Sequence, residues 1–491
     1  MDLFGALAEQ GAMIERIVSD SRRVSPGVAF FAYPGEAADG RLHIADAIAR
    51  GAAAIVWETK GFNWNPQWAV PNVGVKELKQ KAGEFAHEYY GRPSESLWTC
   101  GVTGTNGKTS CTQWIAAALE SHGKPTGVIG TLGAAFGGKS VEIGNTTPDA
   151  LELHRMLAQF KKEGAKAAAM EVSSHGLVQG RVTGVQFDCA LFTNLTHDHL
   201  DYHGTMAAYA SAKARLFQFD SLTHAVVNLD DIVGVRIARG TSERRLPTTG
   251  YSLSPEGIVA GSVDTYIAAR EINVGVDSTR VVLRTSWGER EATLRQLGRF
   301  NVSNILGVLG CLLASGLDLD AALVSIQHLP DVTGRMQRVG GAGRPLAVID
   351  YAHTPDALEK VLNALRPVAD AGRGQVIAVF GAGGDRDALK RPRMGEIAER
   401  LADRIVLTSD NPRSEDPLAI IDAIRAGLSA AHEVEPDRAK AIAGAISSAQ
   451  PGDVVLIAGK GHENYQEIAG KRLPFSDVAV ATQAIAAWGR T

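Results

Sequence analysis

The spacing of apolar and polar positions changes abruptly near residue 103. Leu97 to Val102 form a largely apolar run, the pattern of a buried strand. Thr109 to Glu120 follow with apolar residues at helical spacing, among them Trp114 and Ala118. The sequence therefore predicts a strand, a short glycine-containing loop and a helix in direct succession.

The loop between this strand and helix is typical of a phosphate-binding site. Gly104 and Gly107 allow backbone N–H groups to point at phosphate oxygens, and the start of the helix adds a positive dipole. Lys108 can reach the terminal phosphates, and the Thr109 hydroxyl can bind Mg²⁺. We expect ATP or GTP as a substrate, although this chain has Val102 where the general motif has glycine. The alternative is a glycine-rich turn without a ligand.

Turn and linker signals divide the chain into three expected α/β domains: residues 1–90, 91–330 and 331–491. The first contains short apolar segments, and its charged stretch at residues 20–23 is read as a turn. The third alternates strands with long helical stretches, which predicts a parallel, doubly wound sheet. Its expected strands are residues 346–350, 376–380, 404–408 and 454–458.

Composition excludes several classes of function. The 491 residues are 45% hydrophobic and 21% charged with a net charge of −4, which is ordinary for a soluble protein and gives no basis for binding nucleic acid. The four cysteines are widely separated, so neither a disulfide framework nor a zinc site is expected. The N-terminus lacks a basic leader, and the longest apolar run, residues 305–314, is too short to span a bilayer. We expect a cytoplasmic protein without membrane insertion.

Three features of the second domain suit a metal–nucleotide reaction. Glu171 follows an expected strand, at the sheet edge where open α/β sheets bind ligands, so it is a candidate Mg²⁺ ligand; the alternative is a carboxylate that caps a turn. Residues 197–203 contain three histidines and two aspartates, which can bind a divalent cation or relay protons. Lys213, by its spacing alone, is expected to be a solvated helix lysine.

Four polar loops follow the expected strands of the third domain. Since parallel strands end at one edge of a sheet, these loops predict a pocket. Arg386 and Arg413 offer guanidinium groups to carboxylates, while Asp410 and Glu463 could hold an ammonium group. The implied ligand is an amino acid with more than one carboxylate.

Six motifs in order resemble those of the Mur ligases: residues 103–109, 170–176, 194–204, 350–355, 383–387 and 410–413. The chain is identified as a member of that family, and it resembles most the enzymes that add the third residue of the peptidoglycan peptide. The family loop lacks the first glycine of the general motif, so Val102 is no objection. The resemblance implies a UDP-sugar-binding first domain, an ATP-binding second domain and a Rossmann-like third domain that binds the amino acid.

The resemblance also implies roles for matching positions. Contacts to ATP are implied for Gly104, Thr105, Asn106, Gly107, Lys108, Thr109, Asn301, Arg335 and Asp350. Two Mg²⁺ ions are implied, with Thr109, Glu171, His199 and a carbamylated Lys213 as ligands, and Lys108, His199 and Lys213 are the implied catalytic residues. Contacts to the UDP-N-acetylmuramoyl dipeptide are implied for Ser19, Ser21, Glu36, Ala37, Ala38, Asn145, Thr146, Thr147, Ser173, Gln179 and Arg181. Contacts to diaminopimelate are implied for Arg386, Asp410, Asn411, Pro412, Arg413, Gly459 and Glu463.

The implied reaction activates a carboxylate. ATP phosphorylates the D-glutamate carboxylate of UDP-N-acetylmuramoyl-L-alanyl-D-glutamate, and the amine of the incoming amino acid displaces phosphate. Arg413 favours meso-2,6-diaminopimelate over L-lysine, because only the former has a second carboxylate; the alternative is that Arg413 pairs with Glu415 or Asp416. We expect a monomer. Two other functions stay open: a folylpolyglutamate synthase-like ligase, and a binding protein switched by nucleotide.

Overall fold

The computed structural model describes residues 2–36, 38–258 and 261–489, which form two compact units. The first unit comprises residues 1–251, 259–266 and 307–318, and the second comprises residues 252–258, 267–306 and 319–491. Among the described residues, no helix is both long enough and apolar enough to cross a membrane.

The first unit begins with a parallel sheet buried on both faces. Its strands, in spatial order, are β1 (Arg16–Val18), β2 (Val28–Ala32), β3 (Ala54–Glu58) and β4 (Asn72–Val75). Alternate residues of β2 point to opposite faces, so Phe31 packs with one apolar cluster and Phe30 with the other. The surrounding helices are α1 (Leu3–Glu9), η1 (Ser21–Arg23), η2 (Gly40–His43), α2 (Ile44–Ala49) and α3 (Leu78–Tyr89).

A larger sheet follows in the same unit, in the order β12-β11-β10-β5-β9-β6-β7-β8. Strands from β12 to β6 are parallel, and β7 and β8 extend the sheet as antiparallel hairpins. The strands are β5 (Trp98–Thr103), β6 (Thr126–Gly130), β7 (Gly133–Phe136), β8 (Lys139–Val141), β9 (Ala167–Glu171), β10 (Cys189–Phe192), β11 (His224–Asn228) and β12 (Thr248–Ser252). The expected strand before the phosphate loop is therefore confirmed as β5.

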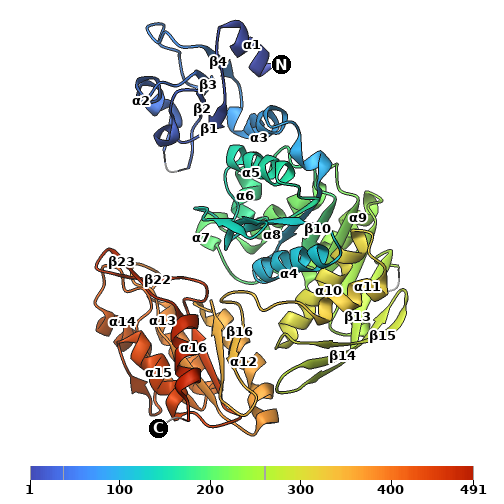
Figure 1. Ribbon diagram of the computed structural model, residues 1–491, viewed down its shortest axis with the longest axis vertical. Helices are drawn as coiled ribbons and strands as arrows, with labels where there is room; N and C mark the ends of the chain where they lie inside the picture. Colours follow the sequence, from blue (N-terminus) through green and yellow to red (C-terminus); the bar gives the residue numbers. More distant parts are fainter. Residues whose placement is uncertain (1, 37, 259–260, 490–491) are drawn as a thin grey trace. The chain divides into compact units, whose positions relative to one another are not determined.

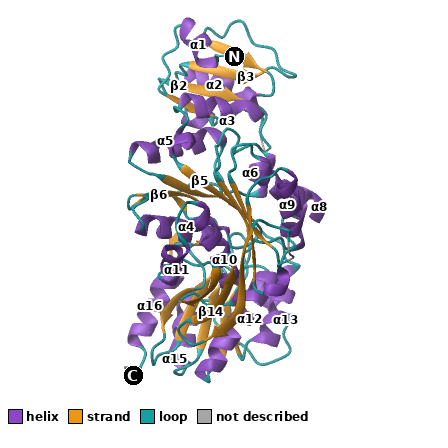
Figure 2. Ribbon diagram, turned by 90° about the vertical axis from the view of Figure 1, so that its right-hand side faces the viewer, coloured by secondary structure: helices purple, strands orange, loops and turns teal. Residues whose placement is uncertain are grey.

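Helices cover this sheet on both faces; Figure 2 shows α4 packed beside the part that contains β5 and β6. The helices are η3 (Pro93–Ser96), α4 (Lys108–Ser121), α5 (Ala150–Lys162), α6 (Ser174–Val178), α7 (Leu200–His203), α8 (Met206–Ala214), η4 (Arg215–Gln218) and α9 (Ile232–Glu243). The wide separation of the cysteines in the sequence does not keep them apart, since Cys100, Cys189 and Cys311 lie together in the core. The spacing of the cysteines along the chain did not indicate this cluster.

The second unit contains the parallel, doubly wound sheet that the sequence predicts. Its order is β16-β17-β21-β18-β19-β20, and all pairs are parallel except β16 with β17. The strands are β16 (Gln337–Gly340), β17 (Leu346–Asp350), β18 (Val376–Phe380), β19 (Arg404–Leu407), β20 (Glu433–Val434) and β21 (Val454–Ala458). All four predicted strands are confirmed, to within one residue.

Helices pack on both faces of this sheet, with α15 (Arg438–Ser448) and α16 (Asp477–Ala487) on one side and α12 (Pro355–Gly372) on the other (Figure 1). The packing of α13 (Lys390–Leu401) and α14 (Pro417–Arg425) completes the second face. Sequence analysis did not predict the antiparallel strands of this unit. Besides β16, these are β13 (Thr265–Val274), whose first two residues belong to the first unit, β14 (Thr279–Thr285), β15 (Gly288–Leu294), β22 (Tyr465–Ile468) and β23 (Lys471–Pro474). The remaining elements are η5 (Pro255–Gly257), α10 (Arg299–Ala314), whose residues from Gly307 on belong to the first unit, and α11 (Leu319–Gln327).

Two glycines in α9 give opposite expectations for the same substitution. A Cβ atom at Gly234 would lie 1.8 Å from the carbonyl oxygen of Asn228, whereas Gly240 has open space around it. Gly234→Ala should therefore lower the thermal unfolding midpoint, since the backbone at Asn228 must shift. Gly240→Ala should stabilise the helix by about 1 kcal/mol. Equal midpoints for the two variants would contradict the close approach of α9 to β11.

Candidate active site

The phosphate loop requires glycine at two positions. Gly104 has φ 150°, and a Cβ atom there would lie 1.9 Å from Oγ1 of Thr193. Gly107 has φ 89° and is the N-cap residue of α4, so the first N–H groups of that helix face the loop. The loop thus has the geometry expected from its sequence, with the helix dipole directed at it.

Residues after β10 and β11 hold the loop in place. The N–H of Thr105 donates to the carbonyl of Asn194 at 2.8 Å, and the Thr193 hydroxyl donates to the carbonyl of Asn106 at 2.6 Å. In turn, the Asn228 amide donates to the Thr193 carbonyl, and the Asp231 carboxylate accepts from the N–H of Leu195, both at 2.6 Å. Sequence analysis did not identify Asn228 or Asp231; the available signal was their position at and just after the end of the parallel strand β11.

Two lysines meet at one carbonyl of the loop. Nζ of Lys108 donates to the carbonyls of Gly104 and Thr105, both at 2.9 Å, and Nζ of Lys213 donates to the Gly104 carbonyl at 2.7 Å. Lys213 is only 1% exposed and its Nζ lies 4.5 Å from the centre of the Tyr209 ring. The solvated position expected from its spacing is therefore wrong. Burial, reinforced by the charge of Lys108, holds the pKa of Lys213 well below its ordinary value.

A buried carboxylate lies at the end of the strand next to the loop. Glu171 is the last residue of β9 and is 2% exposed. Its carboxylate accepts from the N–H of Thr131 at 2.7 Å and from the Thr131 hydroxyl at 3.2 Å. Glu171 thus caps the turn after β6, which is the alternative to a Mg²⁺ ligand given above. A carboxylate has about four lone-pair sites, so these two bonds leave others available to a hard cation. Thr131 was not identified from the sequence, although it follows directly after β6.

The histidine-rich segment forms a ring cluster with α6 and α8. The His199 ring centre lies 4.9 Å from that of His175, and the His203 ring stacks on Tyr209 at 5.0 Å. Burial, followed by the neighbouring His199, lowers the pKa of both His175 and His203. Neutral imidazoles of this kind can bind a metal ion or accept a proton. His199 itself has φ 53° and its Nε2 lies 3.4 Å from the Asp198 carboxylate.

Most residues expected to bind the dipeptide form one polar network in the first unit. The Thr147 hydroxyl bonds to Ser173 at 3.1 Å, and the guanidinium of Arg181 donates to the Thr147 carbonyl at 2.8 Å. Gln179 accepts from Arg181 and donates to the hydroxyl of Tyr202 at 3.3 Å. The network extends to Glu36, which accepts from Tyr202 at 3.1 Å, and to Thr146, whose hydroxyl lies 3.2 Å from that of Thr131.

The other residues of this group are not joined to that network by the observed bonds. Asn145 is exposed, Ser19 and Ser21 flank the turn at Asp20, and the Ala38 carbonyl accepts from Gly35 at 2.8 Å. Ala37 lies outside the described residues. Arg22 is paired with Asp20 at 2.8 Å, in agreement with the charged turn expected there.

Two residues expected near adenosine lie together in the second unit. The Asp350 carboxylate accepts from the N–H groups of Met336 and Ala352, both at 2.8 Å, and burial raises its pKa although Arg335 opposes this. The Arg335 guanidinium lies 4.7 Å from the centre of the Tyr351 ring. Asn301 is buried in α10, and its amide donates to the Leu297 carbonyl at 2.9 Å.

A buried lysine lies among the residues expected to bind diaminopimelate. Nζ of Lys460 donates to Asn411 and to the Glu463 carboxylate, both at 2.9 Å, and Asn411 donates to the same carboxylate at 2.7 Å. Sequence analysis did not identify Lys460. Because Lys460 already balances the charge of Glu463, Asp410 is the better candidate for a substrate ammonium group. Gly459 lies against it, since a Cβ there would be 2.3 Å from Oδ2 of Asp410.

Arg413 is fixed by the hairpin of β22 and β23 and by the loop after β18. Its N–H donates to the Glu467 carbonyl at 3.0 Å, and its guanidinium donates to the Gly384 carbonyl at 2.7 Å and lies 3.8 Å from the Glu467 carboxylate. The expected alternative of pairing with Glu415 or Asp416 is wrong, because Glu415 binds Arg391 and Asp416 caps α14. The carbonyl oxygen of Pro412 would lie 2.0 Å from a Cβ atom at Gly384, so that position has no room for a side chain. The Arg386 side chain is exposed.

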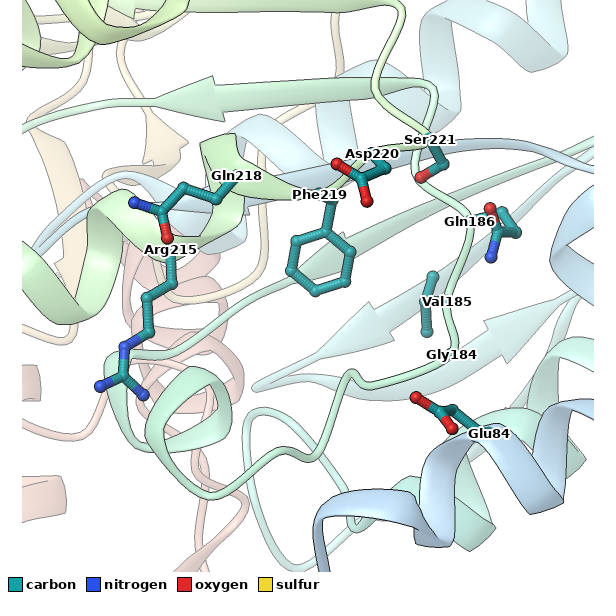
Figure 3. A pocket seen from close by; sticks show the side chains of 9 residues that line it. All are labelled: Glu84, Gly184, Val185, Gln186, Arg215, Gln218, Phe219, Asp220 and Ser221. Atoms are coloured by element: carbon teal, nitrogen blue, oxygen red, sulfur yellow. The ribbon is translucent and has the colours of Figure 1, made fainter. Parts of the chain in front are cut away.

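A separate hollow of about 420 Å³ lies in the first unit (Figure 3). It is lined by Glu84, Gly184, Val185, Gln186, Arg215, Gln218, Phe219, Asp220 and Ser221. Figure 3 shows the Phe219 ring near its middle, with Arg215 to one side. None of the expected site residues lines this hollow.

A glycine loop at a strand–helix junction, two lysines at its carbonyl and a neighbouring buried carboxylate define an α/β protein that handles phosphate groups. Comparison with known families finds three matches: Mur ligase family, catalytic domain, over residues 13–90; Mur ligase middle domain, over residues 102–312; and Mur ligase, glutamate ligase domain, over residues 334–461. The chain belongs to the Mur ligase family.

Its relatives match over nearly their whole length. A Pseudomonas aeruginosa protein named UDP-N-acetylmuramoyl-L-alanyl-D-glutamate--2,6-diaminopimelate ligase is 50% identical, with 98% of this chain and 97% of the relative covered. A Janthinobacterium protein of the same name is 49% identical, with 96% and 94% covered. A solved structure with that name superposes with a TM-score of 0.71 at 38% identity, with 96% of this chain and 95% of the other covered.

Removing the charge of Lys108 tests the phosphate loop. Lys108→Ala should fold, but it should weaken ATP binding by about 2 kcal/mol or more and abolish turnover, because a charged donor to phosphate is lost. Titration calorimetry with ATP and Mg²⁺ measures the binding. Lys161, which is exposed on α5, supplies the control, and Lys161→Ala should bind ATP normally. Near-normal ligation by Lys108→Ala would contradict the assignment of the loop.

Proposed function

We propose that this chain is an ATP-dependent ligase that joins meso-2,6-diaminopimelate to the D-glutamate carboxylate of UDP-N-acetylmuramoyl-L-alanyl-D-glutamate in peptidoglycan synthesis. The observation that carries the proposal is the similarity, at 50% identity over 98% of the chain, to a relative named for this ligase. The phosphate loop and the polar loops of the second unit support it. Residues 1–90, 91–330 and 331–491 are the proposed domains for the UDP sugar, ATP and the amino acid.

The proposed reaction proceeds in two steps. A carboxylate oxygen of D-glutamate attacks the γ-phosphorus of ATP, which gives an acyl phosphate and ADP. The amine nitrogen of diaminopimelate then attacks the acyl carbon, the C–O bond to phosphate breaks, and the amine loses a proton. Lys108 and the N–H groups of residues 104–109 would stabilise the charge on the transferring phosphoryl group.

The donor set beside the loop fits Mg²⁺, because the buried Glu171 carboxylate and the Thr109 hydroxyl supply the oxygen ligands that this ion prefers. Glu171 and Thr109 are the proposed ligands of one ion, and His199 and a modified Lys213 those of a second. When bound, the ions would neutralise phosphate charge. The roles of Asn301, Arg335 and Asp350 toward ATP, and of the network around Thr147 and Arg181 toward the dipeptide, belong to the same proposal.

Lys213 would act as a carbamate. The Lys213 ammonium group first loses a proton. Its neutral Nζ then attacks CO₂, forms an N–C bond and releases a second proton, so a buried cation beside Lys108 becomes an anion. Two observations support this step: the burial of Lys213, and a pKa that burial and Lys108 hold well below the ordinary value. The resulting oxygens would pair with Lys108 and with a hard cation, whereas a free ammonium group would repel both.

Substitution of Lys213 tests the carbamate. Lys213→Ala should be nearly inactive, and a short carboxylate such as acetate should partly restore activity by supplying the missing oxygens. Chloride at equal ionic strength is the control salt, and Lys213→Arg is the control variant, since its guanidinium fills the space and takes up no CO₂. Equal rescue by chloride, or full activity of Lys213→Ala, would rule out the carbamate.

Substitution of Arg413 tests the choice of amino acid. Arg413 would pair with the second carboxylate of diaminopimelate, which L-lysine lacks. Losing one partner of a buried charge pair costs about 2–5 kcal/mol, so Arg413→Ala should lose most of the preference for diaminopimelate over L-lysine. Arg425, which pairs with Asp422 on the surface, provides the matched control, and Arg425→Ala should keep the preference. Incorporation of each amino acid is compared by product mass. Efficient addition of lysine by the unaltered protein would refute the role of Arg413.

The function itself is tested by incubating the protein with UDP-N-acetylmuramoyl-L-alanyl-D-glutamate, ATP, Mg²⁺ and each candidate amino acid, and weighing the product. Phosphate release should depend on the amine. A nucleotide-switched binding protein would release phosphate without regard to the amine, and a folylpolyglutamate synthase-like ligase would need a different acceptor. The cytoplasmic location and the monomeric state stay predictions.

A further inference from the structure

Three buried cysteines converge under α10, away from the residues assigned to substrates. Cys100 of β5 and Cys189 of β10 are direct neighbours in the parallel register, so their side chains leave the sheet on the same face. Cys311 of α10 reaches the same point, and the three sulfur atoms all lie within 4.8 Å of one another. None of the three is accessible to solvent.

Glycines allow α10 to approach the sheet closely enough for this contact. A Cβ atom at Gly307 would lie 2.9 Å from Cδ1 of Leu191, and one at Gly310 would lie 2.8 Å from Cγ1 of Val226. Gly307, Gly310 and Cys311 share one helix face by their spacing of three and four residues. The close packing of that face therefore brings Cys311 to the pair on the sheet.

The sulfur positions suit a metal ion better than a disulfide. The Cys100 and Cys311 sulfurs are 3.9 Å apart, and all three cysteines are free. Three sulfurs bound to one ion at about 2.3 Å would lie about 3.8–4.0 Å apart, whereas a disulfide needs about 2.05 Å. Small rotations of the side chains would bring the cluster to the spacing for an ion.

The chemistry of the cluster selects a soft ion. The ligand atoms that the cluster offers are three sulfurs, which lie within 4.8 Å of one another. Thiolate sulfur prefers ions such as Cu(I) and Zn²⁺ over Mg²⁺, and an apolar core favours complexes with little net charge.

We propose that Cys100, Cys189 and Cys311 form a buried binding site for one soft, thiolate-binding metal ion. A divalent ion would bind two of the sulfurs as thiolates, whose protons are released to solvent, and the third as a neutral thiol. The complex would then carry no net charge. The ion would join β5 and β10 to α10, and Cys100 lies four residues before Gly104 of the phosphate loop. Occupancy would therefore stabilise the strand that carries the loop, independently of the Mg²⁺ that serves the reaction.

Cadmium is a suitable probe, because it binds thiolate strongly and its bonds to sulfur absorb in the ultraviolet. The reduced, full-length protein is dialysed against Cd²⁺ with excess Mg²⁺, and bound metal, charge-transfer absorbance and the unfolding midpoint are measured. We expect one Cd²⁺ per chain and a higher midpoint. Cys189→Ala and Cys311→Ala should lose both effects. Cys111, buried in α4 outside the cluster, supplies the matched control, and Cys111→Ala should retain both.

Three outcomes would overturn the proposal. These are absence of thiolate charge-transfer absorbance in the unaltered protein, retention of Cd²⁺ by folded Cys189→Ala or Cys311→Ala, and equal loss in Cys111→Ala. The first needs no variant, so it decides the matter even if a cluster variant fails to fold. In each case the three cysteines would serve only as small apolar residues of the core.

Discussion

The Gly104 carbonyl accepts hydrogen bonds from two lysine side chains, and this arrangement governs the chemistry of the first unit. Two cations at one oxygen repel each other, and one of them, Lys213, is buried. The site can relieve that repulsion by binding an anion, or by removing the charge of Lys213. A triphosphate provides the first route and the loss of a proton from Lys213 the second. The position of the carbonyl depends on Gly104, because Thr193 leaves no room there for a side chain.

In each unit, the polar residues assigned to ligands lie at the carboxyl ends of the parallel strands of that unit's own sheet. In the first unit, Glu171 ends β9, and the phosphate loop and Thr193 follow the neighbouring strands β5 and β10. In the second unit, Asp350 ends β17, and Asp410 and Lys460 follow β19 and β21. Carboxyl ends of parallel strands leave backbone groups and loop side chains free to bind ligands, so the location of each group of residues follows from topology.

Local pattern was enough to predict β5, β9 and the four main strands of the second unit, since a buried parallel strand is a short apolar run bounded by turn residues. It did not predict β10. The same reasoning failed where a residue's surroundings come from distant parts of the chain. Lys213 follows the buried Tyr209 by one helical turn, but a lysine in a short helix is usually solvated, and its partner Gly104 is more than one hundred positions away. Cys100 and Cys311, and Arg413 with the β22–β23 hairpin, are brought together in the same way. The surface strands β13 to β15 pair antiparallel, and their mixed polar and apolar residues give a weaker signal than a buried strand.

The central claim is that ATP activates a carboxylate by phosphorylation at the Lys108 loop. Isotope transfer tests it most directly. The D-glutamate carboxylate of the nucleotide dipeptide is labelled with heavy oxygen, and the phosphate released during ligation is weighed. An acyl phosphate requires one labelled oxygen to leave with each phosphate. Unlabelled phosphate, released at the rate of ligation, would contradict the account.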